Sequence, residues 1–151
     1  MITIVTVGKK HDALLANAIE RYQERLSAPW NVRWEILPHS SLNASKAALE
    51  ESERILKRVR PSDYIILLDE NGLQVDSPTV SRMLEQQHAT SCRVSFVIGG
   101  AYGVSDKVRE RANSVWSLSA LVFPHQLVRL ILIEQLYRAQ SIARHTPYHH
   151  S

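Results

Sequence analysis

The sequence predicts a single α/β domain in which a mostly parallel sheet carries helices on both faces. Strand-like apolar segments alternate with amphipathic helical segments along the chain, which is typical of parallel sheets. Residues 94–98 are β-branched and aromatic apart from Ser95, without polar alternation, as in a strand that is covered on both faces. The chain has 151 residues, 44% of them hydrophobic, which is enough for one buried core and too little for two. Residues 1–151 are therefore assigned to one domain.

The first unit begins with a strand over residues 2–7, which is rich in β-branched side chains and ends at Gly8. A helix follows, beginning near Asp12 and ending before Pro29, because proline disfavours the helical conformation in the residue before it. Apolar residues recur at spacings of three and four along this helix, so we expect them to share one buried face. They are Leu14, Leu15, Ala18, Ile19, Tyr22 and Leu26.

The second unit is a strand over residues 30–37 and a helix that extends to about Val59. Ser45 is placed to cap the amino end of this helix. Its charged residues are expected to form a solvated face rather than a binding patch. They are Glu50, Glu51, Glu53, Arg54, Lys57 and Arg58.

The second half of the chain continues the alternation. Asn71 and Gly72 predict a turn. Ser77 and Pro78 are typical of a helix amino terminus, because proline fits the first helical position. The remaining predicted elements are strands over residues 64–68, 94–98 and 115–117, a short helical segment before the last strand, and a long helix from about Pro124 to Ala143.

Two loops in the last third of the chain predict a binding site. Three glycines within residues 99–103 follow the apolar strand and let the backbone approach a ligand closely. Residues 117–124 offer backbone donors and small or apolar walls without a titratable group, which suits a flat heteroaromatic ring. Ligands bind at the carboxyl ends of strands in open parallel sheets, so we expect both loops to converge with Asp69 on one crevice.

The long carboxyl-terminal helix is apolar nearly all round. Such a helix must bury two faces, and we expect one to lie on its own sheet and the other on a partner subunit. A homodimer is therefore expected.

Charge and composition indicate in which compartment the protein works and which kinds of partner it can bind. The formal net charge of +3 permits a polyanionic partner without requiring one. The single cysteine, Cys92, supports no disulfide within the chain, and residues 1–7 read as a strand rather than a signal peptide, which favours the cytoplasm. No apolar run approaches the ~20 residues that span a bilayer, so no membrane association is expected.

Candidate polar residues lie at both ends of the last helix. His125 and Arg129 are four residues apart and should share a face. The tail contains Tyr148 and His149, and the proline before them suggests a docked rather than a disordered end. His145 and His149 lack a nearby cysteine or acidic residue that would complete a metal site, so no metal is expected.

Several motifs of the chain resemble those of a known family. They are IVTVGK at the start, NAS followed by ERIL, ILLDENG, VSFVIGGAYG, WSLSALVFPHQLVR, EQLYRA and the terminal PYH. Together they resemble the RlmH-type (YbeA) ribosomal RNA large-subunit methyltransferases of the SPOUT superfamily over essentially the whole length. The resemblance implies an α/β fold whose carboxyl-terminal segment is threaded as a trefoil knot, which general topology rules alone make improbable.

The resemblance also implies a function and a set of site residues. It implies a homodimer that binds S-adenosylmethionine and methylates N(3) of a pseudouridine in 23S ribosomal RNA. For the catalytic step our hypothesis is that a neutral histidine, either His125 or His149, assists loss of the N(3) proton. Arg129 would stabilise the developing charge on the ring carbonyls, and Tyr148 would shape the site or stack on the flipped base. The implied cofactor contacts are Leu68, Gly99, Leu118, Ser119, Ala120, Leu121, Val122 and Phe123.

One departure and two alternatives remain. The family usually ends in Tyr-His followed by Arg or Lys, whereas this chain ends in Tyr148, His149, His150 and Ser151. The expected terminal cation is thus His150, which is mostly neutral at pH 7 if its pKa is ordinary. The alternatives are a non-catalytic ribosome- or RNA-binding module of the same fold and a nucleotide-binding protein of flavodoxin-like type. Against the second, no phosphate-loop fingerprint is present.

Overall fold

The computed structural model describes residues 1–150 and shows a five-stranded, all-parallel sheet. The strand order is β2-β1-β4-β3-β5, and the predicted α/β class is confirmed. Ser151 lies outside the described residues. The elements are β1 (Ile2–Val7), α1 (Ala13–Arg25), β2 (Val32–Leu37), α2 (Ala44–Arg58), β3 (Tyr64–Gln74), α3 (Ser77–Ala89), β4 (Val94–Ile98), α4 (Asp106–Arg111), β5 (Ser114–Ser117) and α5 (His125–Ala143).

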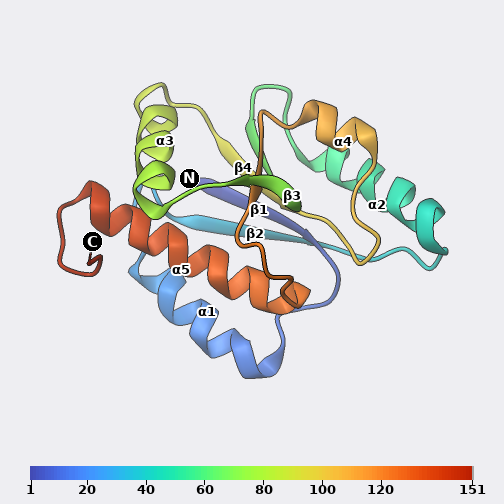
Figure 1. The fold of residues 1–151 in the computed structure, drawn as a ribbon, viewed down its shortest axis with the longest axis horizontal. Helices are drawn as coiled ribbons and strands as arrows, with labels where there is room; N and C mark the ends of the chain where they lie inside the picture. Colours follow the sequence, from blue (N-terminus) through green and yellow to red (C-terminus); the bar gives the residue numbers. More distant parts are fainter. Residues whose placement is uncertain (151) are drawn as a thin grey trace.

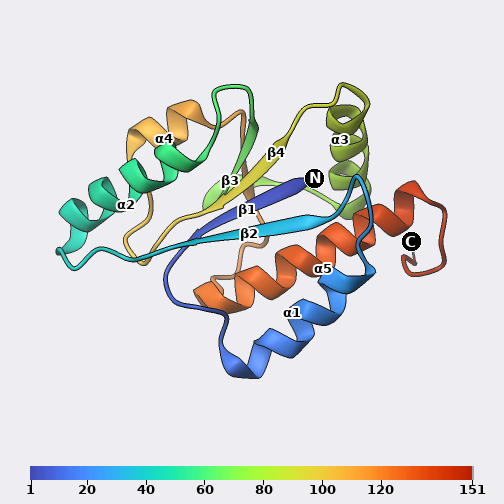
Figure 2. The ribbon, with the colours of Figure 1, turned by 180° about the vertical axis from the view of Figure 1, so that it is seen from behind.

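Helices cover both faces of the sheet, with α1, α3 and α5 on one face and α2 and α4 on the other (Figures 1 and 2). Each face has its own apolar core. Phe96, Ile133 and Leu136 belong to the first core, and Ile55 and Val97 to the second. Because β4 contributes to both cores, its sequence, which is apolar except for the buried Ser95, matches its position in the middle of the sheet.

β3 extends further than predicted. Its pairing with β5 shifts between Leu68 and Leu73, both of which lie opposite Trp116, so the residues between them form an irregular bulge. The predicted turn at Asn71 and Gly72 therefore lies inside an interrupted strand and does not end it. A Cβ on Gly72 would lie 2.6 Å from the carbonyl carbon of Trp116. Glycine is needed here because only its backbone fits so close to β5.

The helix starts follow local capping chemistry. The Asp12 carboxylate accepts a hydrogen bond from the Leu14 backbone N–H at 2.8 Å, as predicted for the start of α1. The α2 helix begins after Asn43 rather than at Ser45, and α3 is capped by Asp76. Leu14 was predicted to be buried and is 91% exposed, so the buried face of α1 begins one residue later.

α5 runs between α1 and α3 across one face of the sheet (Figure 1). The two neighbouring helices cover part of the apolar surface that the sequence assigned to a partner. Leu130 and Ile131 remain half-buried, and together with Ala18 and Tyr22 of α1 they line a second hollow. Within residues 1–150, α5 and the other helices are too short or too polar to cross a membrane.

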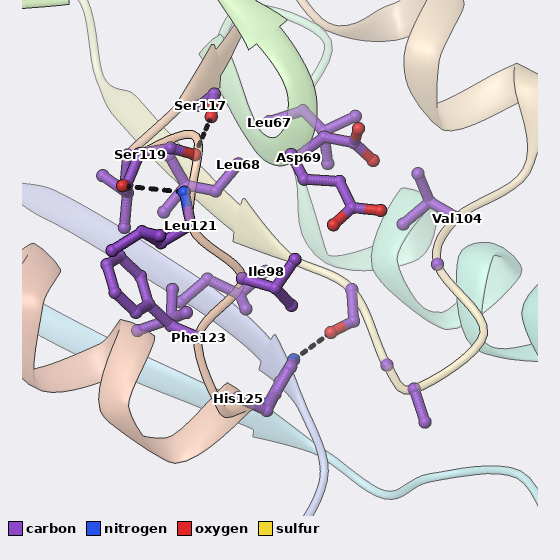
Figure 3. A pocket seen from close by; sticks show the side chains of 18 residues that line it. Leu67, Leu68, Asp69, Ile98, Val104, Ser117, Ser119, Leu121, Phe123 and His125 are labelled. Carbon is purple, nitrogen blue, oxygen red and sulfur yellow. Dashed lines mark hydrogen bonds between the residues drawn. The ribbon is translucent and has the colours of Figure 1, made fainter. Parts of the chain in front are cut away.

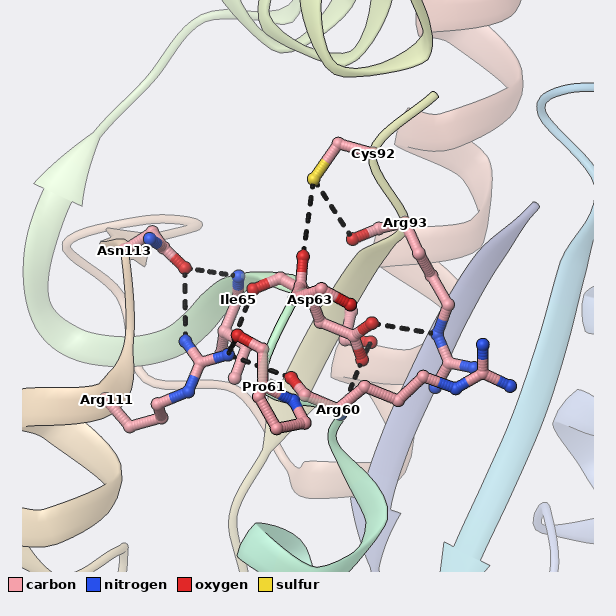
Figure 4. A network of polar contacts seen from close by, with 10 residues as sticks. Arg60, Pro61, Asp63, Ile65, Cys92, Arg93, Arg111 and Asn113 are labelled. Atoms are coloured by element: carbon pink, nitrogen blue, oxygen red, sulfur yellow. Dashed lines mark hydrogen bonds and ion pairs between the residues drawn. The ribbon is translucent and has the colours of Figure 1, made fainter. Parts of the chain in front are cut away.

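A polar network connects the amino ends of three strands, β3, β4 and β5 (Figure 4). The buried Asp63 carboxylate accepts a hydrogen bond from the Ser95 hydroxyl at 2.9 Å and forms an ion pair with Arg93 at 3.3 Å. Arg111 donates to three backbone carbonyls within residues 60–63 at 2.9 to 3.1 Å. These contacts join the starts of β3 and β4 to the turn before β5, at the edge of the sheet opposite the site described next.

Candidate functional site

A pocket lies at the carboxyl ends of β3, β4 and β5 (Figure 3). The two predicted loops meet there with Asp69, which confirms their expected convergence. Of the predicted cofactor contacts only Ala120 lies outside the lining, on the exposed side of its loop. The lining residues are Leu67, Leu68, Asp69, Glu70, Ile98, Gly99, Gly100, Ala101, Gly103, Val104, Ser117, Leu118, Ser119, Leu121, Val122, Phe123, His125 and Val128.

The loop between β5 and α5 forms one wall through its own hydrogen bonds. The Ser117 hydroxyl donates to the Ser119 carbonyl at 2.7 Å, and the Ser119 hydroxyl accepts from the Leu121 N–H at 3.0 Å. Leu121 and Val122 are 70% and 78% exposed. Exposed apolar side chains beside a pocket are typical of a surface that a ligand or partner covers.

The glycine-rich loop after β4 forms the opposite wall. The Gly103 N–H donates to the Gly100 carbonyl at 3.1 Å, and Gly103 has a φ of 75°, which favours glycine. A Cβ on Gly99 would lie 2.7 Å from a methyl group of Val104. The shape of this wall therefore depends on the absence of a side chain at residue 99.

α2 supports the same loop from behind. The Ser52 hydroxyl accepts a hydrogen bond from the Ser105 N–H at 2.8 Å. Glu51 was predicted to be solvated and is instead 3% exposed, with its carboxylate against Gly100. The missed signal was its spacing, because Ala47, Glu51 and Ile55 are four residues apart and share the buried face of α2.

His125 lies at the first position of α5 and points into the pocket (Figure 3). Its Nε2 contacts the Gly99 carbonyl oxygen. Burial lowers the pKa of His125 and outweighs the opposing effect of this hydrogen bond. The ring is therefore neutral near pH 7. A carbonyl oxygen only accepts, so Nε2 carries the proton and Nδ1 is the basic nitrogen.

Asp69 lies on the third side of the pocket and is charge-paired. Its carboxylate accepts from Arg109 at 2.6 Å and from the Asn71 N–H at 2.9 Å. Burial alone would raise the pKa of Asp69, but these hydrogen bonds and the Arg109 charge hold it below its usual value. Asp69 is thus ionised near neutral pH, with its charge balanced by Arg109.

Arg129 lies beneath the pocket region and does not line it. The side chain is fully buried and donates to the Lys9 carbonyl at 2.8 Å and towards His11 Nδ1 at 3.3 Å. Burial and the Arg129 charge lower the pKa of His11, so its neutral ring accepts this hydrogen bond. Arg129 therefore anchors the loop between β1 and α1, which presents the exposed side chains of Lys9 and Lys10.

The tail docks at the other end of α5, away from the pocket of its own chain (Figure 1). The Tyr148 hydroxyl donates to Glu134 at 3.1 Å and lies 3.2 Å from the Tyr22 hydroxyl. Its ring packs on Tyr137, with the centroids 4.7 Å apart. His149 Nδ1 lies 3.5 Å from Arg138. Within one chain, Tyr148 and His149 are thus separate from His125 and the cofactor loops.

The family of the chain follows from comparison with known proteins. A family model described as "Predicted SPOUT methyltransferase" matches residues 1–149. The chain belongs to this family. The SPOUT methyltransferase match spans every strand and helix above, including the three loops around the pocket.

The chain is also similar to proteins named "Ribosomal RNA large subunit methyltransferase H". It is 38% identical to the one from Parabacteroides distasonis over 154 residues, covering 99% of this chain and 98% of the relative. It is 41% identical to the one from Christiangramia forsetii over 154 residues, with the same coverage. The relative from Dictyoglomus thermophilum is 38% identical over 151 residues, covering 99% of both chains.

Proposed function

We propose that this protein is an S-adenosylmethionine-dependent methyltransferase that acts on N(3) of a pseudouridine in 23S ribosomal RNA. The observation that carries the proposal is the pocket, because seven of the eight residues matched to the family's cofactor contacts line it. The names of the relatives supply the substrate class, which is large-subunit ribosomal RNA. A cytoplasmic location agrees with this substrate.

The pocket fits the proposed cofactor. Apolar side chains such as Leu68, Leu118 and Phe123 suit an adenine ring, and the neighbouring backbone offers donors and acceptors for its edge. Within the described lining there is no lysine or arginine to bind a phosphate. The lining therefore favours a phosphate-free cofactor over the flavodoxin-like alternative.

His125 is the candidate base within one chain. The bound cofactor supplies a methyl group that its sulfonium already activates. The protein must therefore align the nucleophilic nitrogen and remove its proton. The neutral ring of His125 presents Nδ1 for that proton, while Nε2 stays on the Gly99 carbonyl.

We propose that Arg129 and the basic loop interact with the negative charges of the RNA substrate. Arg129 is buried beside Gly8, so we propose that its cation acts on the developing charge of the base through the electric field rather than by contact. Lys9 and Lys10 are exposed on the loop that Arg129 holds, which suits RNA phosphates. The folded ribosomal RNA then supplies much of the specificity through its shape.

Tyr148 and His149 are proposed to complete the site of a second copy of the chain. They pack on Tyr137 and Arg138 in the carboxyl-terminal half of α5, whereas His125 is the first residue of this helix. A two-fold dimer that packs α5 against α5 in antiparallel orientation would bring the tail of one subunit to the pocket of the other. Burial and the neighbouring Tyr22 and Glu134 raise the pKa of Tyr148, so its neutral ring is available to stack on a flipped base.

We expect the purified protein to sediment as a homodimer, at about twice the chain mass, at micromolar concentration. The proposed interface is the hollow between α1 and α5, lined by Ala18, Leu130 and Ile131, with the exposed Leu14 one turn away. Leu14→Glu should shift the protein towards the monomer, because a charge would be buried there. Ala89→Glu on α3 is the matched surface control. A monomeric wild-type protein with full methyltransferase activity would contradict the shared site.

Labelled methyl transfer to ribosomal RNA tests the function directly. We expect purified protein to transfer the label from S-adenosylmethionine to large-subunit RNA and to one pseudouridine, mapped by digestion and mass spectrometry. Uridine and pseudouridine both carry a proton on N(3), so methylation at N(3) does not by itself tell them apart. The mapping must therefore also identify the base. Binding of the ribosome without methyl transfer would instead support the non-catalytic module.

A further inference from the structure

The carboxylate of Glu51 lies behind the pocket with one oxygen unpartnered. Oε1 accepts a hydrogen bond from the Ser40 N–H at 2.9 Å. Oε2 is buried and has no hydrogen-bond partner within residues 1–150. A buried carboxylate oxygen without a partner is unfavourable in the folded protein. A glutamine would accept the same hydrogen bond at lower cost, so the charge calls for a role beyond stability.

Gly100 lies between α2 and the pocket, with its backbone against this carboxylate. A Cβ on Gly100 would overlap Oε2 and would lie 3.0 Å from the Glu51 carboxyl carbon. Gly100 itself lines the pocket. Burial and, to a smaller extent, the Arg129 charge lower the pKa of His125, and the Glu51 carboxylate opposes that shift, so its charge reaches the lining.

The side chains that line the pocket include the acidic residues Asp69 and Glu70, and the described lining contains no lysine or arginine. Arg109 pairs with Asp69, and on α2 the neighbouring Glu50 pairs with Arg54. No ion pair to Glu51 is formed within the described chain. An unpaired charge in a water-poor site acts strongly on a nearby ligand charge.

We propose that Glu51 lets the pocket distinguish the cationic sulfonium of S-adenosylmethionine from the neutral thioether of S-adenosylhomocysteine. The inference rests on the proposed function. These two ligands share their adenosine and amino-acid parts and differ in one methyl group and its positive charge. When the methyl group leaves, the bonding electron pair stays on sulfur, which becomes neutral. Glu51 thus stabilises the bound donor and not the bound product.

Calorimetric titration of the full chain with three ligands tests the proposal. They are S-adenosylmethionine, S-adenosylhomocysteine and sinefungin, which carries an ammonium near the position of the sulfonium. Glu51→Gln should weaken binding of the two cationic ligands by about tenfold and change that of the product by less than about twofold. Glu53→Gln, an exposed neutralisation on the same helix, should leave all three affinities unchanged.

The outcomes separate this proposal from the proposed function. If wild-type protein binds all three ligands but Glu51→Gln weakens them equally, or weakens none, the charge role is wrong and the cofactor site stands. If wild-type protein binds neither S-adenosylmethionine nor its product, both proposals fail. Glu51→Asp covers the case in which the glutamine variant does not fold. It keeps the charge, so preference for the cationic ligands should persist, and its loss would overturn the proposal.

Discussion

Deleting residues 148–151 is expected to abolish methylation of ribosomal RNA while leaving the affinity for S-adenosylmethionine nearly unchanged. The cofactor loops lie at the carboxyl ends of the strands, whereas Tyr148 contacts Glu134 and Tyr137, from the middle of α5 onward. The deletion therefore removes groups proposed to act in the partner's site without touching the lining of the pocket. Calorimetry and a methyl-transfer assay on the same preparation measure the two effects separately.

The structure also defines the controls for this deletion. Tyr148 packs on Tyr137 and on Arg138, so its loss exposes apolar surface on α5, and a thermal melt must show that the truncated protein stays folded. Tyr148→Phe keeps the ring and removes only the hydroxyl, and it should retain most activity if the tyrosine acts by stacking. Full methylation by the truncated protein would show that the tail has no role in the reaction.

Position 150 offers a finer test within the same tail. His150 is exposed and stands where the resemblance implies arginine or lysine. If a cation is needed there, the His150→Arg variant should match or exceed the wild-type activity near neutral pH. His150→Ala removes the side chain and should lower the activity if a cation is needed there.

Gly99→Val is expected to abolish cofactor binding in a protein that still folds. The Cβ would lie 2.7 Å from Val104 and 3.4 Å from the backbone of Gly103, so the loop must move to accept it. Both of those residues line the pocket, and His125 is held by the Gly99 carbonyl. The substitution thus changes one wall of the site and the position of the candidate base together.

Circular dichroism should show native secondary structure for Gly99→Val, because the residue follows β4 and makes no part of either core. Ala89→Val adds a side chain of the same kind at an exposed position at the end of α3 and should bind the cofactor normally. Unchanged affinity in folded Gly99→Val would place the cofactor elsewhere than in this pocket.

Local sequence patterns predicted the strand and helix order and the converging loops. Apolar runs and glycine positions are properties of neighbouring residues, and in a parallel sheet every strand ends at the same edge. The burial of Glu51 was not predicted, because it depends on Ser40 and Gly100, which only the fold brings to α2. The exposure of Leu14 was missed because helical spacing alone does not fix the limits of a buried face.

Arg129 and the tail show a further limit. The four-residue spacing places His125 and Arg129 on one side of α5, yet one ring enters the pocket and the other side chain runs under the loop of Lys9. Spacing gives the direction of a side chain from the helix axis and not what it meets there. The positions of Tyr148 and His149 relative to a site depend on a second chain, which a single sequence does not place.

Because of the polar network around Asp63 and Arg111, the amino ends of the strands differ from their carboxyl ends. At one edge the starts of β3 and β4 and the approach to β5 are fastened by an ion pair and by the branched guanidinium of Arg111. At the other edge the connections are glycine turns and a serine-rich loop. We expect these contacts to hold the register of the strands when a ligand binds to the loops at their carboxyl ends. The amino ends of the strands thus serve as the fixed part of the molecule, and the loops at the carboxyl ends as the part that adapts to a ligand.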